Sequence, residues 1–358
     1  MTPPPLEFAF LEDGAQTAEG TAATLAAFIA EARTSLEIAI YDLRLDGPAA
    51  QALLDAVKGA AARGVAVRVV FNWEPEKRVV NPLPPPSRVD WELLKAMGVP
   101  FQPVKGIPDL MHHKYVVRDS EEVWTGSTNW TMDSWTREEN VIVRVLSAEL
   151  AKDYQGDFEY LWSTKEVAGS GKFSAPWITL PGFRFRPFFS PGRGQKMSHE
   201  IAHRISIATH RVRIASPVLT SGPVLGTLAE LIKSPRCNVS GVYDRTQMAE
   251  VKHQWSAQPL SSWKLAAFEA VEASGLFASK VTTPYAPGSV HDFMHAKMTV
   301  ADDTVFVGSY NLSHSGESNA ENVLEIESAA AADLCAAYID RIAARYRAPA
   351  PAPAPTPT

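Results

Sequence analysis

The most constraining feature of this chain is a series of polar residues that occurs twice. Each copy has a His-x-Lys triplet, an Asp five positions after the Lys, a Gly-Ser-x-Asn stretch and, ten positions after its Asn, a Glu-Asn-Val stretch. The repeated residues are His112, Lys114, Asp119, Gly126, Ser127, Asn129 and Glu139 in the first copy and His295, Lys297, Asp302, Gly308, Ser309, Asn311 and Glu321 in the second. Such a repeat predicts two similar structural units. Because the repeated residues are polar and of catalytic types, we expect them to form two halves of one active site.

Hydrophobic periodicity around the two motifs predicts strands that alternate with helices. The expected helices are 21–33, 48–63, 91–97 and 148–162 in the first half and 199–209, 224–232 and 329–346 in the second. This alternation predicts an α/β fold of two similar α/β/α sandwich halves, related by a pseudo-twofold axis, with mixed but mainly parallel sheets and one active site at their interface. A globular chain of 358 residues is long enough for each half to bury its own core.

The composition of the chain predicts where the halves meet. Periodicity is interrupted at Gly169-Ser170-Gly171, so we expect one half at 1–168, the other at 169–347, and a disordered Pro/Ala-rich tail at 348–358. Two stretches differ between the halves, the proline-rich 73–88 and the polar 244–263. Both follow strand ends, where they are either plain connecting loops or loops that contact the substrate.

Cysteine usage, charge and hydropathy narrow the class of protein. Cys237 and Cys335 fit neither a disulfide framework nor a metal-ligand spacing. The N-terminus shows no secretory signal and no segment approaches the roughly 18 apolar residues of a membrane helix, so we expect a cytoplasmic monomer without an integral membrane segment. Residues 1–164 carry 15 Lys and Arg against 24 Asp and Glu. This acidic half argues against a strong non-specific nucleic-acid binder.

The repeated residue types fit the recognition and transfer of a phosphate group. Residues two apart on a strand share a face, so His112 and Lys114 project together, as do His295 and Lys297. Lysine binds phosphate as a point charge, and histidine acts as a nucleophile or a proton donor. Hydroxyl, amide and backbone N–H groups of the Gly-Ser-x-Asn turns suit phosphate oxygens. The lysines would repel a cation, so we expect no metal and no cofactor.

These residues resemble the phospholipase D superfamily, whose signature is HxKxxxxD followed by GSxN. The first copy matches completely, whereas the second has one residue fewer between Asp302 and Gly308, at a predicted hairpin turn where we expect it to be tolerated. The resemblance spans nearly the whole chain. It implies a metal-independent phosphoric diester hydrolase that works in two steps through a phosphohistidine intermediate.

The resemblance also implies roles for the individual residues. His112 would be the nucleophile, His295 would protonate the leaving alcohol, and Glu321 and Glu139 would orient His112 and His295, respectively. The side chains expected to hold the phosphate oxygens are Lys114, Lys297, Asn129, Asn311, Ser127 and Ser309. The residues expected to be structural are Asp119, Asp302, Gly126 and Gly308.

Three functions remain open, and we favour the first. It is a phospholipase D-type enzyme that cleaves or transfers a phospholipid head group. The second is a metal-independent endonuclease of the same superfamily, with nucleic acid as the substrate. Such nucleases commonly have one motif per chain and dimerise, whereas this chain has both, and its acidic half also weakens this reading. The third, a non-catalytic phosphate-binding module, fits poorly with intact His and Lys in both copies.

Overall fold

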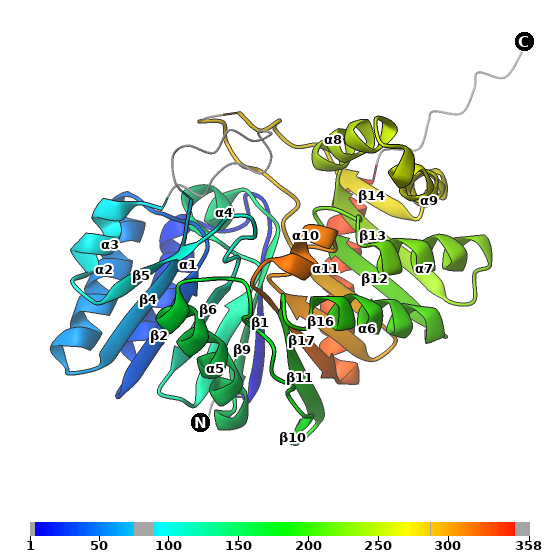
Figure 1. Cartoon of the computed structure of the whole chain (residues 1–358). Coiled ribbons are helices and arrows are strands. Elements are labelled where there is room, and N and C mark those ends of the chain that lie inside the picture. Colours follow the sequence, from blue (N-terminus) through cyan, green and yellow to red (C-terminus); the bar gives the residue numbers. More distant parts are fainter. Residues whose placement is uncertain (1–3, 75–88, 287, 348–358) are drawn as a thin grey trace, which may run out of the picture.

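The computed structural model describes residues 4–74, 89–286 and 288–347, and it contains two large sheets (Figure 1). The predicted tail and residues 75–88 of the proline-rich stretch lie outside the described residues. The first sheet has seven strands in the order β1-β9-β7-β6-β2-β4-β5. These strands are β1 (Leu6–Leu11), β2 (Ser35–Ile40), β4 (Ala66–Trp73), β5 (Phe101–Lys105), β6 (Lys114–Arg118), β7 (Glu122–Gly126) and β9 (Asn140–Leu146).

The second sheet has eight strands in the order β10-β11-β17-β16-β15-β12-β13-β14. These strands are β10 (Ile178–Leu180), β11 (Phe183–Ser190), β12 (Arg211–Ser216), β13 (Asn238–Asp244), β14 (Phe277–Lys280), β15 (Met298–Ala301), β16 (Thr304–Gly308) and β17 (Glu321–Glu327). A short pair, β3 (Leu43–Arg44) and β8 (Trp130–Thr131), lies apart from both sheets. The two-halved mixed α/β fold predicted from the sequence is confirmed.

The expectation of mainly parallel sheets is wrong. Among the described strands of the first sheet, only the β2–β4 and β4–β5 neighbours run parallel, and the same holds for β12–β13 and β13–β14 in the second. Parallel neighbours need a crossover connection. The repeated motifs instead form the antiparallel hairpins β6–β7 and β15–β16, which pair onward with β9 and β17.

Helices lie against the faces of both sheets (Figure 1). The helices α1 (Ala18–Ala30), α2 (Gly47–Ala62) and α3 (Trp91–Met97) pack on the first sheet, and α6 (Gly194–Ile207), α7 (Gly222–Lys233) and α9 (Ser262–Ala273) on the second. Two longer helices, α5 (Ala148–Thr164) and α11 (Ala329–Tyr346), begin at the N-cap residues Ser147 and Ser328, whose side chains accept backbone N–H groups. No helix of the described residues is long and apolar enough to cross a membrane.

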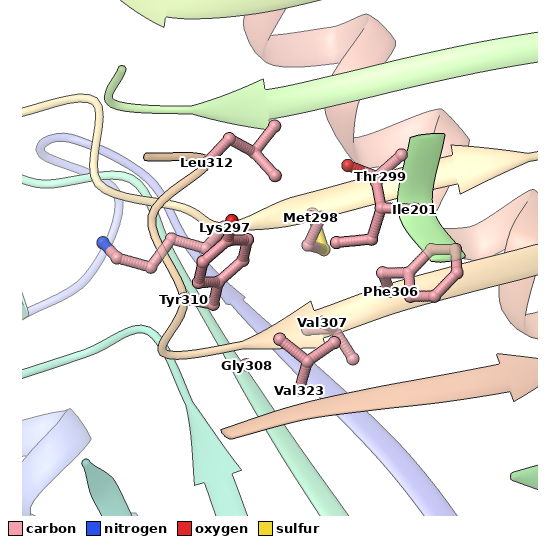
Figure 2. A pocket seen from close by; sticks show the side chains of 10 residues that line it. All are labelled: Ile201, Lys297, Met298, Thr299, Phe306, Val307, Gly308, Tyr310, Leu312 and Val323. Atoms are coloured by element: carbon pink, nitrogen blue, oxygen red, sulfur yellow. The ribbon is translucent and has the colours of Figure 1, made fainter. Parts of the chain in front are cut away.

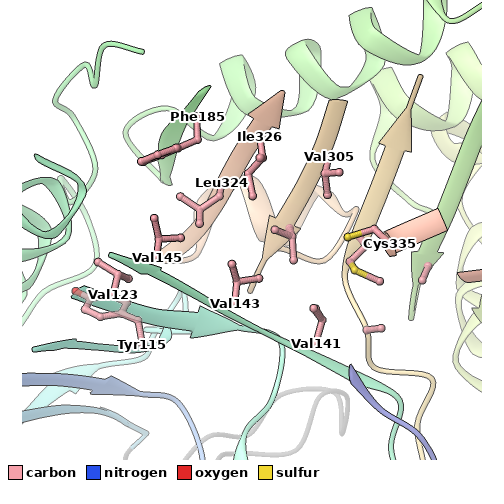
Figure 3. Close-up of a cluster of buried hydrophobic side chains, with 14 of the residues drawn as sticks. Tyr115, Val123, Val141, Val143, Val145, Phe185, Val305, Leu324, Ile326 and Cys335 are labelled. Atoms are coloured by element: carbon pink, nitrogen blue, oxygen red, sulfur yellow. The ribbon is translucent and has the colours of Figure 1, made fainter. Parts of the chain in front are cut away.

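One hydrophobic core is shared by the two halves. It contains Val143 and Val145 of β9, Val305 of β16, Leu324 of β17 and residues of α5 and α11 (Figure 3). Each half also buries a second core under its outer helices. The two halves are therefore joined by apolar packing in a shared core, in addition to the separate core of each half. This packing holds the two motifs at a common interface. The predicted division at residue 168 lies between α5 and β10.

The polar stretch 244–263, read from the sequence as a loop, is largely helical. Its main element is α8 (Arg245–Ser256), whose N-cap Asp244 accepts the backbone N–H of Gln247. Only Met248 and Trp255 of this helix are buried. So few buried positions leave no apolar stripe of helical period in the sequence, which is why the helix was missed.

Candidate functional site

The two His-x-Lys segments meet because each is bound to the backbone of the opposite half. The N–H of His112 donates to the carbonyl of Ala320 at 2.9 Å, and the N–H of His295 donates to the carbonyl of Glu139 at 3.1 Å. Both contacts belong to parallel bridges between halves, Met111 with Ala320 and Glu139 with Met294. The repeat in the sequence thus becomes an approximate symmetry of backbone contacts around one site.

The histidines and lysines of the motifs are almost completely enclosed. Their exposed fractions are 6% for His112, 2% for Lys114, 9% for His295 and 3% for Lys297. Each lysine ammonium donates to the backbone carbonyl of its own histidine, at 2.7 Å in both halves. His113, on the opposite face of the chain, is buried against Asp157 at 2.9 Å instead. The alternation predicted from the sequence therefore separates His112 from His113.

Burial depresses the pKa values of all four basic groups, and repulsion from the lysines lowers the pKa of three of them further. Desolvation lowers the pKa of Lys114 to about 7 and that of Lys297 well below its ordinary value, and the charge of Lys114 lowers the latter further. The pKa values of His112 and His295 are also lowered, first by desolvation and then by the two lysines. An anion bound among these groups would stabilise their protonated forms, so the electrostatics of the site favour an anionic ligand.

This electrostatic arrangement predicts pH-dependent anion binding. Tungstate, whose charge is constant from neutral to alkaline pH, should bind with an affinity that falls as the pH rises above about 7, the pKa of Lys114 without a bound anion. The sign follows because the anion favours protonated Lys114, which above its pKa must take up a proton on binding. Isothermal titration calorimetry on either side of pH 7 measures this, with exposed Lys58→Met as the control. An affinity that rises with pH would contradict it.

Glu321 lies where the sequence places it, beside the histidine of the other half. Its carboxylate is 2.8 Å from Nδ1 of His112 and also accepts the hydroxyl of Ser309 at 2.6 Å. Glu321 is fully buried, and desolvation raises its pKa to about 7. A carboxylate on Nδ1 fixes the tautomer of the ring and leaves Nε2 available for chemistry.

Glu139 does not face His295, and the prediction that it does is wrong. Its carboxylate is bound to the Lys280 ammonium at 2.9 Å and to the hydroxyl of Tyr346. Nδ1 of His295 lies instead 3.1 Å from Oδ1 of Asn140 and 3.4 Å from Oε2 of Glu138. Side chains alternate along an extended segment, so Glu138 and Asn140 share the face toward His295 and Glu139 lies on the opposite face.

The error has a simple cause in the register of the two halves. Ser127 donates to Asn140, thirteen residues later, whereas Ser309 donates to Glu321, twelve residues later. The first half therefore has one extra residue after its Gly-Ser-x-Asn stretch, so that Asn140, not Glu139, takes the place of Glu321. The matching Glu-Asn-Val letters conceal this offset.

The hydroxyls of Ser127 and Ser309, expected on the phosphate, are committed within the protein. Ser127 donates to Asn140 at 2.7 Å and accepts the N–H of Val141, and Ser309 makes the equivalent contacts to Glu321 and Asn322. Both serines are fully buried. They orient the groups behind the histidines, and the geometry gives them no free proton for a substrate. This corrects the phosphate-binding role predicted for them.

Asn129 and Asn311 keep polar atoms free. The side-chain oxygen of each is buried and has no hydrogen-bond partner among the described residues. They lie three residues beyond the ends of β7 and β16 and two residues beyond the serines that support the site. Their predicted role as phosphate ligands remains a prediction.

The remaining motif residues lie in the framework of the hairpins. Asp119 accepts the backbone N–H groups of Arg33, Thr34 and Ser35, and Asp302 accepts those of Thr209, His210 and Arg211. Desolvation alone would raise the pKa of each carboxyl. The backbone N–H donors outweigh desolvation and lower the pKa below its ordinary value. The residue missing from the second motif falls in the β15–β16 turn: Arg118 pairs with Glu122 but Ala301 pairs with Thr304.

Gly126 and Gly308 end the second strand of each hairpin. A Cβ atom on either would lie 2.1 Å from a backbone carbonyl of β9 or β17, respectively. No side chain fits there without moving the neighbouring strand, so these glycines are structural.

Sequence reasoning also missed Tyr41 and Lys280. The ring of Tyr41 lies edge-on to His112, with centroids 4.5 Å apart, and beneath the Lys114 ammonium at 4.8 Å. Lys280 is 3% exposed and joins the second half to Glu139 and, at 3.2 Å, to Asp13. Neither lies in a repeated motif, so no pattern marks it.

Behind Lys297 the second half contains a small cavity (Figure 2). Its volume is about 10 Å³, and its lining includes Phe306, Tyr310 and Leu312. This is about the space of one water molecule. The cavity is too small for an organic substrate, and the Lys297 ammonium extends away from its apolar lining (Figure 2). No group of three or more His, Cys, Asp or Glu among the described residues is placed to hold a metal ion.

Known proteins share both the sequence pattern and the fold. A family model described as "Cardiolipin synthase, PLD-like domain" matches residues 25–162 and 201–343. The mitochondrial cardiolipin hydrolase of Xenopus tropicalis is 30% identical over 138 residues, which is 38% of this chain and 59% of that protein. The match thus spans less than two thirds of the relative's length.

Two solved structures resemble the fold over almost the whole chain. The phosphatidylserine synthase of Haemophilus influenzae has a TM-score of 0.64 at 15% identity and covers 96% of this chain and 86% of its own. The polyphosphate kinase of Porphyromonas gingivalis has a TM-score of 0.60 at 10% identity and covers 94% of this chain and 46% of its own. Because the family model covers most of both halves, and the motif residues converge at their interface, the chain belongs to the phospholipase D-like domain family.

Proposed function

We propose that this protein is a phosphodiesterase of the phospholipase D type that cleaves, or transfers to another alcohol, the head group of a phospholipid. The observation that carries the proposal is the pairing across the halves: a buried histidine and lysine from each motif, with the nearest carboxylate of each histidine supplied by the opposite half. Four basic groups in one enclosed site suit a phosphodiester anion.

The proposed reaction has two steps. In the first, Nε2 of His112 attacks phosphorus, the bond to the leaving alcohol breaks, and His295 gives its proton to the alcohol oxygen. In the second, His295 takes a proton from water, the water oxygen attacks phosphorus, and the P–N bond breaks. This releases a phosphomonoester and free His112. An alcohol in place of water would give a new diester.

The order of the two histidines is supported by their partners. A phosphorylated imidazole carries a positive charge, and the Glu321 carboxylate at 2.8 Å from Nδ1 of His112 would stabilise it. His295 has an amide at the equivalent position. Lys114 and Lys297, with Asn129 and Asn311, would hold the non-bridging oxygens as charge develops.

Two similarities favour a phospholipid as the substrate. One relative by sequence is named a cardiolipin hydrolase, and one neighbour by fold is named a phosphatidylserine synthase. The acidic balance of residues 1–164 also weakens the nucleic-acid alternative.

The proposal predicts activity on lipid vesicles in the presence of a chelator. With EDTA, purified protein should release head groups from phosphatidylcholine or cardiolipin vesicles and leave single- and double-stranded DNA intact. Head-group release is measured by mass spectrometry, and DNA integrity by electrophoresis. DNA cleavage without lipid turnover would identify the endonuclease instead, and turnover of neither would remove the proposed function.

A further inference from the structure

The two histidines are supported by the same pair of residue types in reversed order. In the second half Asn319 and Glu321 point toward the site, and in the first half Glu138 and Asn140 do so. The backbone contacts of Ala320 to His112 and of Glu139 to His295 establish this correspondence. A carboxylate is therefore hydrogen-bonded to His112, whereas His295 is hydrogen-bonded to an amide and its nearest carboxylate lies beside that amide, 3.4 Å from Nδ1.

The orientation of the Asn140 amide is determined by its neighbours. Its NH2 group donates to Glu138 at 3.2 Å and to Ser134, both of which offer oxygen acceptors. Its Oδ1 accepts the hydroxyl of Ser127 at 2.7 Å and faces Nδ1 of His295 at 3.1 Å. Nδ1 of the neutral ring must then carry the proton, which leaves the lone pair on Nε2. Asn140 sets the tautomer but supplies no charge.

We propose that Glu138 is the positioning residue that equips His295 as the general acid and base, acting through Asn140 and across 3.4 Å to Nδ1. The proposal rests on the phosphodiesterase function proposed above. A carboxylate in direct contact favours a lasting positive charge on His112. The Glu138 carboxylate is farther from its ring nitrogen, at 3.4 Å against 2.8 Å for Glu321, so it supports a positive charge on His295 more weakly and the proton can leave and return within one turnover.

The surroundings of Glu138 make its charge responsive. It is 2% exposed, and desolvation raises its pKa to about 7. The groups that face it from the packed elements are His295, Lys297, Lys280, Lys114 and Arg44. The charges of Lys297 and Lys280 oppose the effect of burial on the pKa of Glu138, so Glu138 titrates in the same range as the chemistry it supports. Its charge should then act on the protonation of His295.

The test compares two substrates that differ only in the need for an acid. Phosphatidyl-4-nitrophenol releases a stable phenolate, whereas phosphatidylcholine releases an alkoxide that must be protonated. Glu138→Gln should lower kcat/KM for phosphatidylcholine by roughly 10- to 100-fold and that for phosphatidyl-4-nitrophenol by less than about 3-fold. Effects through the lysines would lower both values alike, because both substrates place the same phosphate in the site.

Two further variants separate positioning from structure. Adding Asn140→Asp to Glu138→Gln places a carboxylate where Glu321 stands in the other half, and it should restore much of the lost kcat/KM for phosphatidylcholine, which reports the first step, in which His295 acts as the acid. Glu139→Gln, at the neighbouring buried position, should leave the ratio of the two kcat/KM values unchanged. Equal losses on both substrates in Glu138→Gln, or no recovery in the double variant, would overturn the proposal.

A direct titration keeps this result independent of lipid turnover. In protein labelled with 15N-histidine, Glu138→Gln should lower the pKa of His295 with little change at His112, and Glu321→Gln should do the reverse, as followed by NMR. Unchanged titration of His295 would overturn the role of Glu138. If the wild type cleaves neither lipid while the titrations behave as expected, the proposed substrate fails and the role of Glu138 stands.

Discussion

His112→Ala should lower phosphodiester turnover by roughly 10⁴-fold or more, because it removes the proposed nucleophile and no other group can form the covalent intermediate. His295→Ala should also lose turnover, but for a different reason. With an activated leaving group such as 4-nitrophenolate, the first step does not need an acid, whereas the second step still needs a base. Protein that carries the remaining phosphomonoester of the substrate on histidine, here called phosphorylated protein, should therefore accumulate in His295→Ala and be absent from His112→Ala.

Intact-protein mass spectrometry after an alkaline quench, which preserves phosphohistidine, measures this difference. His203→Ala is a suitable control because this histidine is exposed on α6. Phosphorylated protein in His112→Ala but not in His295→Ala would reverse the assigned roles. Full activity in either variant would remove the shared-site mechanism.

Gly126→Ala should destabilise the fold by about 3 kcal/mol or more, the upper range for overpacking a buried position. Gly126 has a φ of 146°, and an added Cβ would lie 2.1 Å from the carbonyl oxygen of Val141. That oxygen accepts the N–H of Ser127 at 2.9 Å, so relief of the clash would shift β9 and disturb the serine that holds Asn140. Urea unfolding followed by circular dichroism measures the loss.

Gly156→Ala provides the matched control for this substitution. Gly156 lies within α5, its φ is not positive, and an added Cβ meets no heavy atom within 4 Å. Alanine should therefore raise the free energy of unfolding, by up to about 1 kcal/mol, through its higher helix propensity. Equal free energies for Gly126→Ala and the wild type would show that the strand can move without cost.

Sequence patterns correctly predicted those parts of the fold that depend on interactions between residues close together in the chain. Helices α3 and α11 have the predicted limits because apolar residues recur at helical spacing and start and stop signals flank them. The shortened turn after Asp302 was also predicted, because a two-residue β15–β16 turn is an ordinary hairpin connection. Strand direction was predicted wrongly, because side-chain patterning does not distinguish a hairpin from a crossover.

The candidate site shows the same division. The letters of the motifs identify His112, Lys114, His295 and Lys297 as a set, since their spacing places each pair on one face. The residues of the repeated motifs could not identify Glu138 as a partner of His295. The two Glu-Asn-Val stretches match residue for residue, yet one extra residue after α4 (Met132–Thr136) turns Glu139 toward Lys280 and brings Asn140 into the place of Glu321.

The sequence by itself determined the family, the two-halved fold and the basic groups of the site, because these follow from short-range spacing along the chain. Only the tertiary structure decided which groups support His295, because those groups come from the opposite half, with Asn140 155 residues away. Their choice depends on the register of β9 and β17 across the shared core. A shift of one residue in a strand exchanges its two faces, and here it gives chemically equal motifs unequal partners.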